Sequence, residues 1–124
     1  MEFDDLVKRV VSICYDVHGE LGCGFVEKIY ENSLLIALDE AGFIARAQQG
    51  IEAKFRGQVV GEFYVDIIVE ETLFIELKAV SSIESVHKAQ LLNYLKSSGK
   101  ESGLLVNFGT MKLEVNRLYN KHVG

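Results

Sequence analysis

The spacing of the apolar residues changes once along the chain, and this change restricts the fold more than any other sequence feature. In the first segment the apolar residues recur every three or four positions, as in an amphipathic helix: Leu6, Val10, Ile13, Val17 and Leu21. We predict this helix from about Asp4 to His18, ended by the glycine-rich run 19–24. A second helix is predicted from about Val26 to Ala41, with Gly42 as its stop signal.

Beyond Gly42 the pattern is that of strands. Ile51, Ala53 and Phe55 alternate with polar neighbours, and the tripeptide 56–58, Arg-Gly-Gln, is typical of a turn. The segments Val59–Val69 and Leu73–Val80 are rich in β-branched and aromatic residues, and the tripeptide Glu70–Thr72 separates them. Three consecutive antiparallel strands are therefore predicted.

The last third of the chain returns to a helix and then to strands. Ser85 is a predicted cap for a helix from about Val86 to Ser98, which the glycine-containing segment 99–103 ends. The apolar run Leu104–Val106 follows, so strand, helix and strand form a right-handed crossover with two parallel strands. Leu113–Leu118 is a last, edge-like strand. The predicted fold class is α/β, a mixed sheet flanked by helices.

The size and composition of the chain are those of one globular domain, residues 1–124, with 48% hydrophobic and 25% charged residues. No apolar run approaches the ~18 residues of a membrane helix, and the acidic N-terminus is unlike a signal peptide. We therefore expect a cytoplasmic protein without a membrane partner. Cys14 and Cys23 lack a CxxC pair, so we expect reduced structural thiols rather than a disulfide.

Three charged residues interrupt segments that otherwise have the composition of buried strands. Asp66 follows Tyr64 and Val65 and precedes Ile67, and both Glu76 and Lys78 lie in the run Leu73–Val80. Charged groups in a core cost several kcal/mol unless they are paired or bound to a metal ion. Glu76 and Lys78 are two positions apart, so they share one face of their strand.

The length of the loop between the two strands decides whether Asp66 and Glu76 can meet. A two-residue turn at Glu70–Glu71 would pair Asp66 with Ile75 and send Glu76 to the other face. A three-residue loop, Glu70–Thr72, or a bulge would bring the two carboxylates together. We predict the three-residue loop or a bulge.

Two carboxylates opposite one another on neighbouring strands could share one magnesium or manganese ion. Such an ion polarises a phosphate and lowers the pKa of a bound water, while Lys78 could stabilise the negative charge that develops. This chemistry suits the hydrolysis of a phosphodiester. The alternative is that Asp66 and Glu76 point into solvent from a half-buried sheet, with Lys78 as a surface partner.

The two flanking helices carry further polar candidates. Glu27, Tyr30, Glu31 and Leu34 share one helical stripe, so Glu27 could bind a metal ion directly or through water, and Glu31 could pair with an exposed lysine. The alternative for Glu27 is a first-turn acid stabilised by the helix dipole. The next helix presents His87, Gln90 and Tyr94 on one face, which could reach the same site or form a solvated face. His18 and His122 lack a second ligand at zinc spacing.

These residues together resemble the PD-(D/E)XK nuclease signature: Asp66, nine intervening residues, then Glu76-Leu77-Lys78, with Val65 where that family often has proline. The run Gln90–Tyr94 resembles the QxxxY element of the RecB-like branch. Gly24–Tyr30 resembles the motif that names the GxxExxY proteins, and this resemblance covers nearly the whole chain, including His18–Gly22 and Gly103–Gly109.

The resemblance implies a restriction endonuclease-like αβββαβ core with an extra N-terminal helix. It implies Glu27, Asp66 and Glu76 as metal ligands, Lys78 as catalytic, and Gln90 and Tyr94 as auxiliaries, with which we group Tyr30 and His87. The cofactor implied is Mg²⁺ or Mn²⁺.

The predicted function is that of a metal-dependent nuclease acting on nucleic acid, DNA rather than RNA. A net charge of −5 opposes binding to phosphates, so we expect a homodimer or a protein partner that supplies affinity. Two alternatives remain. The first is a non-catalytic nucleic-acid or protein interaction module that retains the nuclease fold. The second is a small-molecule or nucleotide hydrolase with the same metal site.

Overall fold

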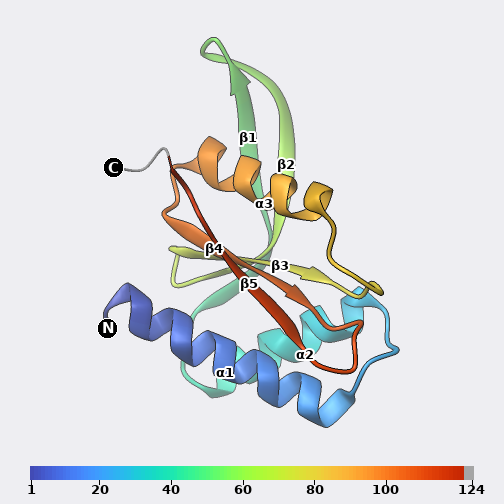
Figure 1. Ribbon diagram of the computed structural model, residues 1–124. Coiled ribbons are helices and arrows are strands. Elements are labelled where there is room, and N and C mark those ends of the chain that lie inside the picture. The colour runs from blue at the N-terminus through green and yellow to red at the C-terminus, as the bar shows by residue number, and fades with distance from the viewer. Residues whose placement is uncertain (122–124) are drawn as a thin grey trace.

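A five-stranded mixed sheet forms the centre of the protein, with helices on both of its faces (Figure 1). The computed structural model describes residues 1–121, so His122 lies outside the described residues. The elements follow the order α1 (Phe3–Leu21), α2 (Glu27–Glu40), β1 (Ala45–Phe55), β2 (Gln58–Val69), β3 (Leu73–Lys78), α3 (Ser85–Ser98), β4 (Ser102–Asn107) and β5 (Glu114–Tyr119). The predicted αβββαβ order, preceded by an extra helix, is confirmed.

The strands lie in the sheet in their order along the chain, β1-β2-β3-β4-β5. All neighbouring pairs are antiparallel except β3 and β4, which are parallel and are joined through α3. The predicted parallel crossover is therefore confirmed, and β5 is an edge strand as expected. Among the described residues, no helix combines the length and apolar character that a membrane crossing requires.

Two apolar clusters hold the helices to the sheet, one on each face. The larger cluster joins α1 and α2 to the face that carries Ile67, Ile75 and Val106. The smaller one joins Leu91 and Leu95 of α3 to the opposite face. The alternation of β3 is visible here, because Ile75 and Leu77 face α1 and α2 while Phe74 faces α3.

Several predicted element bounds shift for physical reasons. The helix α1 continues to Leu21, beyond the predicted end at His18, because Leu21 still packs against the core and Gly22 ends the helix with φ +70°. The strand β1 begins at Ala45, before the alternating pattern at Ile51, because its ladder to β2 starts there. Ser85 is the first residue of α3 rather than its cap, and Glu84 occupies the N-cap.

The hairpin of β1 and β2 projects from the body of the molecule beyond α3 (Figure 1). Its tip is a two-residue turn in which Arg56 has φ +52° and Gly57 has φ +79°, and Phe55 pairs with Gln58. Positive φ at both central residues is the geometry of a type I′ turn. The predicted turn is confirmed, although Gln58 already belongs to β2.

Candidate active site

The strands β2 and β3 separate at Asp66 and Glu76, and the two carboxylates fill the fork between them. The ladder pairs Val69 with Leu73 and Ile67 with Ile75, so the loop contains the three residues 70–72. The next pair in this register is Asp66 with Glu76. The predicted three-residue loop is confirmed, and the two acids lie opposite one another.

Each carboxylate accepts a hydrogen bond from the backbone of the other strand. The N–H of Asp66 donates to Glu76 Oε1 at 3.0 Å. The N–H of Leu77 donates to Asp66 Oδ2 at 2.9 Å. The carboxylate oxygens therefore take the place of the carbonyl acceptors that a regular ladder would supply at this position, and this explains how two acids are accommodated in a sheet.

Burial and nearby negative charges raise the pKa of both acids. Glu76 is only 4% exposed. Burial raises the pKa of Glu76 to about 8, with a further contribution from the charge of Asp66. Burial also raises the pKa of Asp66, although the Leu77 hydrogen bond opposes this shift. A nearby cation would relieve both costs.

The side chain of Lys78 points from the same strand toward α3. Its Nζ donates to Gln90 Oε1 at 3.3 Å, so Gln90 contacts the lysine. Tyr94, one turn further along α3, stacks on Phe63 of β2 with ring centroids 4.2 Å apart. The pKa of Tyr94 is raised by burial and then by the charges of Glu76 and Asp66, which places its hydroxyl in the field of the carboxylates.

The first turn of α2 brings two more acids to the same region. Glu27 is the first residue of the helix. Burial raises the pKa of Glu27. The charge of Lys78 on β3 lowers this pKa, and the charge of Asp66 on β2 raises it. Glu31 is 4% exposed, and its Oε2 forms the predicted ion pair with an exposed lysine, Lys28.

The hydroxyl of Tyr30, a predicted auxiliary residue, is committed to the fold. Tyr30 is fully buried, and its ring stacks on Phe108 with centroids 4.7 Å apart. Its hydroxyl donates to the Gly22 carbonyl at 2.6 Å and accepts from the Phe25 N–H at 3.2 Å. Tyr30 thus holds the glycine-rich loop directly before Glu27.

The histidines and cysteines have local structural contacts. The ring of His87 accepts a hydrogen bond at Nδ1 from the Glu84 N–H at 3.0 Å, which closes the first turn of α3. His18 Nε2 donates to the Thr110 carbonyl at 2.9 Å. Both cysteines are free, as predicted, and burial raises the pKa of the Cys14 thiol to about 12.

Gln48 is a site residue that the sequence did not reveal. Its Nε2 donates to Glu31 Oε1 at 2.8 Å and to Asp66 Oδ1 at 3.4 Å. Gln48 is the fourth residue of β1. The part of this strand before Ile51 has no alternating apolar pattern, so spacing alone gave no signal. It joins the acid of α2 to the acid of β2.

The carboxylate oxygens of the fork are the hard ligands that Mg²⁺ and Mn²⁺ prefer. Within residues 1–121, however, no three His, Cys, Asp or Glu side chains are grouped closely enough to hold a metal ion together. Glu27 is exposed at the start of α2, and its role as a third ligand stays a prediction. Magnesium commonly takes one or two carboxylates and completes its shell with water and substrate oxygens, so the pair Asp66 and Glu76 fits the ion.

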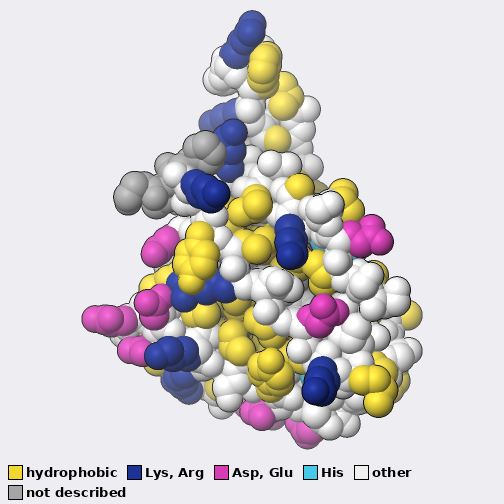
Figure 2. Space-filling view, viewed as in Figure 1, with side chains coloured by type: hydrophobic (Ala, Val, Ile, Leu, Met, Phe, Trp, Pro, Cys, Tyr) yellow, Lys and Arg dark blue, Asp and Glu magenta, His cyan; other side chains and the backbone are white. Residues whose placement is uncertain are grey.

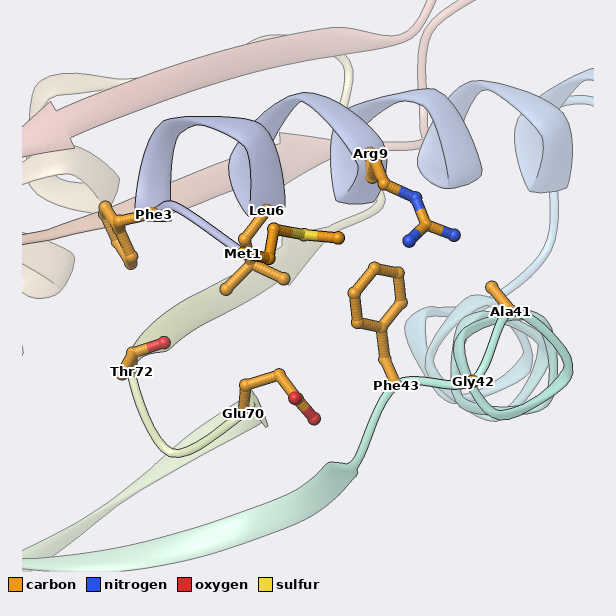
Figure 3. Close-up of a pocket in the computed structure, with 9 residues that line it drawn as sticks. All are labelled: Met1, Phe3, Leu6, Arg9, Ala41, Gly42, Phe43, Glu70 and Thr72. Carbon is orange, nitrogen blue, oxygen red and sulfur yellow. The ribbon is translucent and has the colours of Figure 1, made fainter.

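A pocket of about 420 Å³ lies elsewhere on the surface and contains none of these residues (Figure 3). In Figure 3 the Arg9 guanidinium lies beside the Phe43 ring, 4.6 Å from its centroid, and Glu70 comes from the β2–β3 loop. Glu70 already accepts the Ile44 N–H at 2.6 Å. This pocket has no acid pair, so the candidate site is the fork rather than the pocket. The pocket is lined by Met1, Phe3, Leu6, Arg9, Ala41, Gly42, Phe43, Glu70 and Thr72.

Comparison with solved structures shows the same fold in other proteins. The chain is similar to the structure titled SSO0001, with a TM-score of 0.60 and 23% identity over 75% of this chain and 49% of that one. It is also similar to an alkaline exonuclease, LHK-Exo, from Laribacter hongkongensis, with a TM-score of 0.56 and 15% identity over 88% of this chain and 66% of that one. The chain thus spans about half of the first protein and about two thirds of the second. A search of curated proteins found no match.

The comparison with family models gives the family. The model of the PD-(D/E)XK nuclease superfamily matches residues 4–118, which is nearly the whole chain and includes the fork, Lys78 and the polar face of α3. The narrower resemblance to GxxExxY proteins stays a prediction. With the fork geometry and this match together, the chain belongs to the PD-(D/E)XK nuclease superfamily.

Proposed function

We propose that this protein is a metal-dependent nuclease that hydrolyses phosphodiester bonds in DNA, with Asp66, Glu76 and Lys78 as its central residues. The observation that carries the proposal is the fork, in which the buried Glu76 and the half-buried Asp66 face each other and each carboxylate accepts a hydrogen bond from a backbone N–H of the other strand. Membership of a nuclease superfamily supports the reaction class. The choice of DNA follows from the resemblance in the sequence.

Each side chain has a distinct part in this proposal. Asp66 and Glu76 would hold one Mg²⁺ or Mn²⁺ ion through the oxygens that do not accept backbone hydrogen bonds. Glu27 would add a ligand through water, because it lies at the exposed start of α2. The ion, when bound, supplies Lewis-acid polarisation of the phosphate and a lowered pKa for water.

The cationic and polar residues would act on the phosphate. The ammonium of Lys78 can donate to a phosphate oxygen and offset the negative charge that grows during hydrolysis. Its contact with Gln90 keeps it on the α3 side of the sheet. The ring of Tyr94 is stacked on Phe63, and its hydroxyl, on which the charges of Glu76 and Asp66 act, could donate a hydrogen bond to a phosphate oxygen.

Affinity for a polyanion needs a source beyond the site. The net charge is −5, and on the face in Figure 2 the basic side chains lie among acidic and hydrophobic ones rather than in one continuous area. We therefore propose that a second copy or a protein partner in the cytoplasm contributes phosphate contacts. Light scattering at the protein concentrations used in the assays tests whether two copies associate.

Cleavage assays on the full chain test the proposal. Labelled single- and double-stranded DNA and RNA are incubated with Mg²⁺, Mn²⁺ or a chelator, using wild type, Glu76→Gln and Glu101→Gln. Glu101 is an exposed acid before β4, so its variant controls for the loss of one charge. We expect cleavage of DNA that needs the metal, is lost in Glu76→Gln by at least ~100-fold and is kept in Glu101→Gln.

Other outcomes separate the alternatives. Binding of DNA without cleavage by any metal form would favour the non-catalytic module. Cleavage of RNA alone would show that the substrate is RNA rather than DNA. Hydrolysis of free nucleotides alone would favour the small-molecule hydrolase. Cleavage that survives in Glu76→Gln would contradict the assignment of the fork.

A further inference from the structure

Gln48 has a backbone conformation that residues with a Cβ rarely adopt, inside a strand where it is not expected. Its φ is +53°. Its neighbours pair regularly with β2, Ala47 with Ile67 and Gln49 with Val65, so Gln48 lies opposite Asp66. Non-glycine residues with positive φ concentrate at functional sites, where the surrounding contacts hold them in place.

At this point in the hairpin, the side chains of each strand change from one side of the sheet to the other. Ala45 packs against the α1 and α2 side of the sheet, whereas Ile51, six residues later, packs against the α3 side. The partner strand changes in the same way, because Ile67 belongs to the first cluster and Val65 to the second. In a regular strand, residues separated by an even number lie on the same face. Gln48 and Asp66 therefore mark the turn of the hairpin from one face to the other.

The side chain of Gln48 spans the two acids that flank it. Its Nε2 donates to Glu31 Oε1 at 2.8 Å and more weakly to Asp66 Oδ1 at 3.4 Å. Glu31 is almost completely buried, and Lys28 occupies its other oxygen. The amide group thus separates a buried carboxylate on α2 from the one carboxylate oxygen of Asp66 that no backbone N–H engages.

We propose that Gln48 is a positioning residue that fixes the orientation of the Asp66 carboxylate toward the metal ion. Asp66 Oδ2 is held by the Leu77 N–H, so a donor at Oδ1 fixes the rotation of the whole carboxylate. Without the amide, Glu31 Oε1 would lose its donor and repel Asp66. The inference rests on the proposed function, because it takes Asp66 as a metal ligand.

The competing role for Gln48 is purely structural, namely to bend the hairpin. Glycine adopts positive φ without steric cost, whereas alanine does not, and neither carries an amide. If Gln48 served only to bend the hairpin, the Gln48→Gly variant would equal or exceed wild type in every property measured. The positioning role requires that Gln48→Gly and Gln48→Ala both lose metal affinity, although the glycine variant is the more stable of the two.

Electron paramagnetic resonance titration with Mn²⁺ tests this on the full chain, with urea unfolding measured in parallel. The variants are Gln48→Ala, Gln48→Gly, Glu76→Gln and, as a matched control, Gln58→Ala at the exposed hairpin tip. We expect the Mn²⁺ Kd to rise about 10- to 100-fold in both Gln48 variants, as for other residues that orient ligands, and to stay unchanged in Gln58→Ala. Glu76→Gln should show no site of comparable affinity.

The outcomes distinguish this inference from the proposed function. Wild-type affinity in Gln48→Gly, with binding lost in Glu76→Gln, would overturn the positioning role and leave the nuclease proposal intact. Mn²⁺ binding that is absent in wild type, or unaffected by Glu76→Gln, would overturn both. Affinity that falls in both Gln48 variants, while the unfolding midpoint of Gln48→Gly stays above that of Gln48→Ala, supports the inference.

Discussion

At the scale of single residues, the candidate site depends on acids that replace backbone acceptors. Asp66 and Glu76 each accept one N–H across the fork, so their burial is partly compensated by hydrogen bonds. The remaining cost appears as raised pKa values for both acids. Under the proposed function, a divalent cation that binds these two acids would displace the protons that they retain.

Glu76 should make the stability of the metal-free protein depend on pH. Its pKa is about 8 in the folded protein against an ordinary value of 4.5, so the folded state binds the proton more tightly than the unfolded state. This contribution to stability is complete below about pH 4.5 and is lost as pH rises toward 8. Urea unfolding between pH 5 and 8 in the presence of a chelator should show wild type losing stability relative to Glu76→Gln. Parallel curves for the two proteins would contradict this prediction.

Tyr30 should contribute to stability through its hydroxyl. The variant Tyr30→Phe keeps the stacked ring but removes the hydrogen bonds to Gly22 and Phe25. We expect a loss of about 1–2 kcal/mol in the free energy of unfolding, measured with urea. Tyr15→Phe is the matched control, because Tyr15 is 53% exposed, and it should change stability by less than ~0.5 kcal/mol. Equal effects in the two variants would show that the loop contact is unimportant.

At the scale of elements, the end of β4 is tied to the segment that follows β3. The buried side chain of Asn107 accepts the Val80 N–H at 3.0 Å and donates to the Val80 carbonyl at 3.0 Å. Its Oδ1 also accepts the Gly109 N–H at 3.0 Å. These contacts fix the chain directly after Lys78, so they help to position the lysine.

Gly109→Ala should disrupt this connection. A Cβ at Gly109 would lie 2.4 Å from Val80 N and 2.5 Å from Val80 O, and backbone atoms cannot move aside cheaply. We expect a loss of roughly 1–3 kcal/mol in the free energy of unfolding. Gly61→Ala in β2 is the control, since nothing lies within 4 Å of its added Cβ, and it should be close to neutral. A neutral Gly109→Ala would mean that this segment can move away from β4.

At the scale of the whole molecule, the site forms where three layers meet. The helix α2 supplies Glu27 and Glu31 from one face of the sheet, and α3 supplies Gln90 and Tyr94 from the other. Between them lies the fork of β2 and β3. Under the proposed function, a metal ion bound at the fork would lie between these layers, so we expect its binding to stabilise the complete fold.

Divalent cations should therefore raise the thermal unfolding temperature of wild type. A ligand that binds only the folded state stabilises it by about 2.7 kcal/mol at 100 times its Kd. Differential scanning fluorimetry with increasing Mn²⁺ should show a rising Tm for wild type and Glu101→Gln. Glu76→Gln should show no such rise, and an equal rise in all three proteins would point to nonspecific binding.

Much of the fold was predictable because local patterns and tertiary contacts agree. The apolar periods of α1 and α2, the turn at Arg56–Gly57 and the three-residue loop after Val69 follow from spacing and turn chemistry. The start of β1 was not predictable, because Ala45–Gly50 owes its strand conformation to pairing with β2 rather than to its own pattern. The cap of α3 was wrong by one residue, because the Glu84 N–H bonds to the ring of His87 and the helix begins at Ser85.

The sequence by itself predicted that Asp66 and Glu76 lie opposite one another with Lys78 on the same face, because charges inside strands of this composition need partners and a three-residue loop places the acids in register. Only the tertiary structure decided that Tyr30 serves the core and that Gln48 joins Glu31 to Asp66. These features depend on how α2 packs across β1 and β2, and contacts between distant segments leave no periodic trace in the chain.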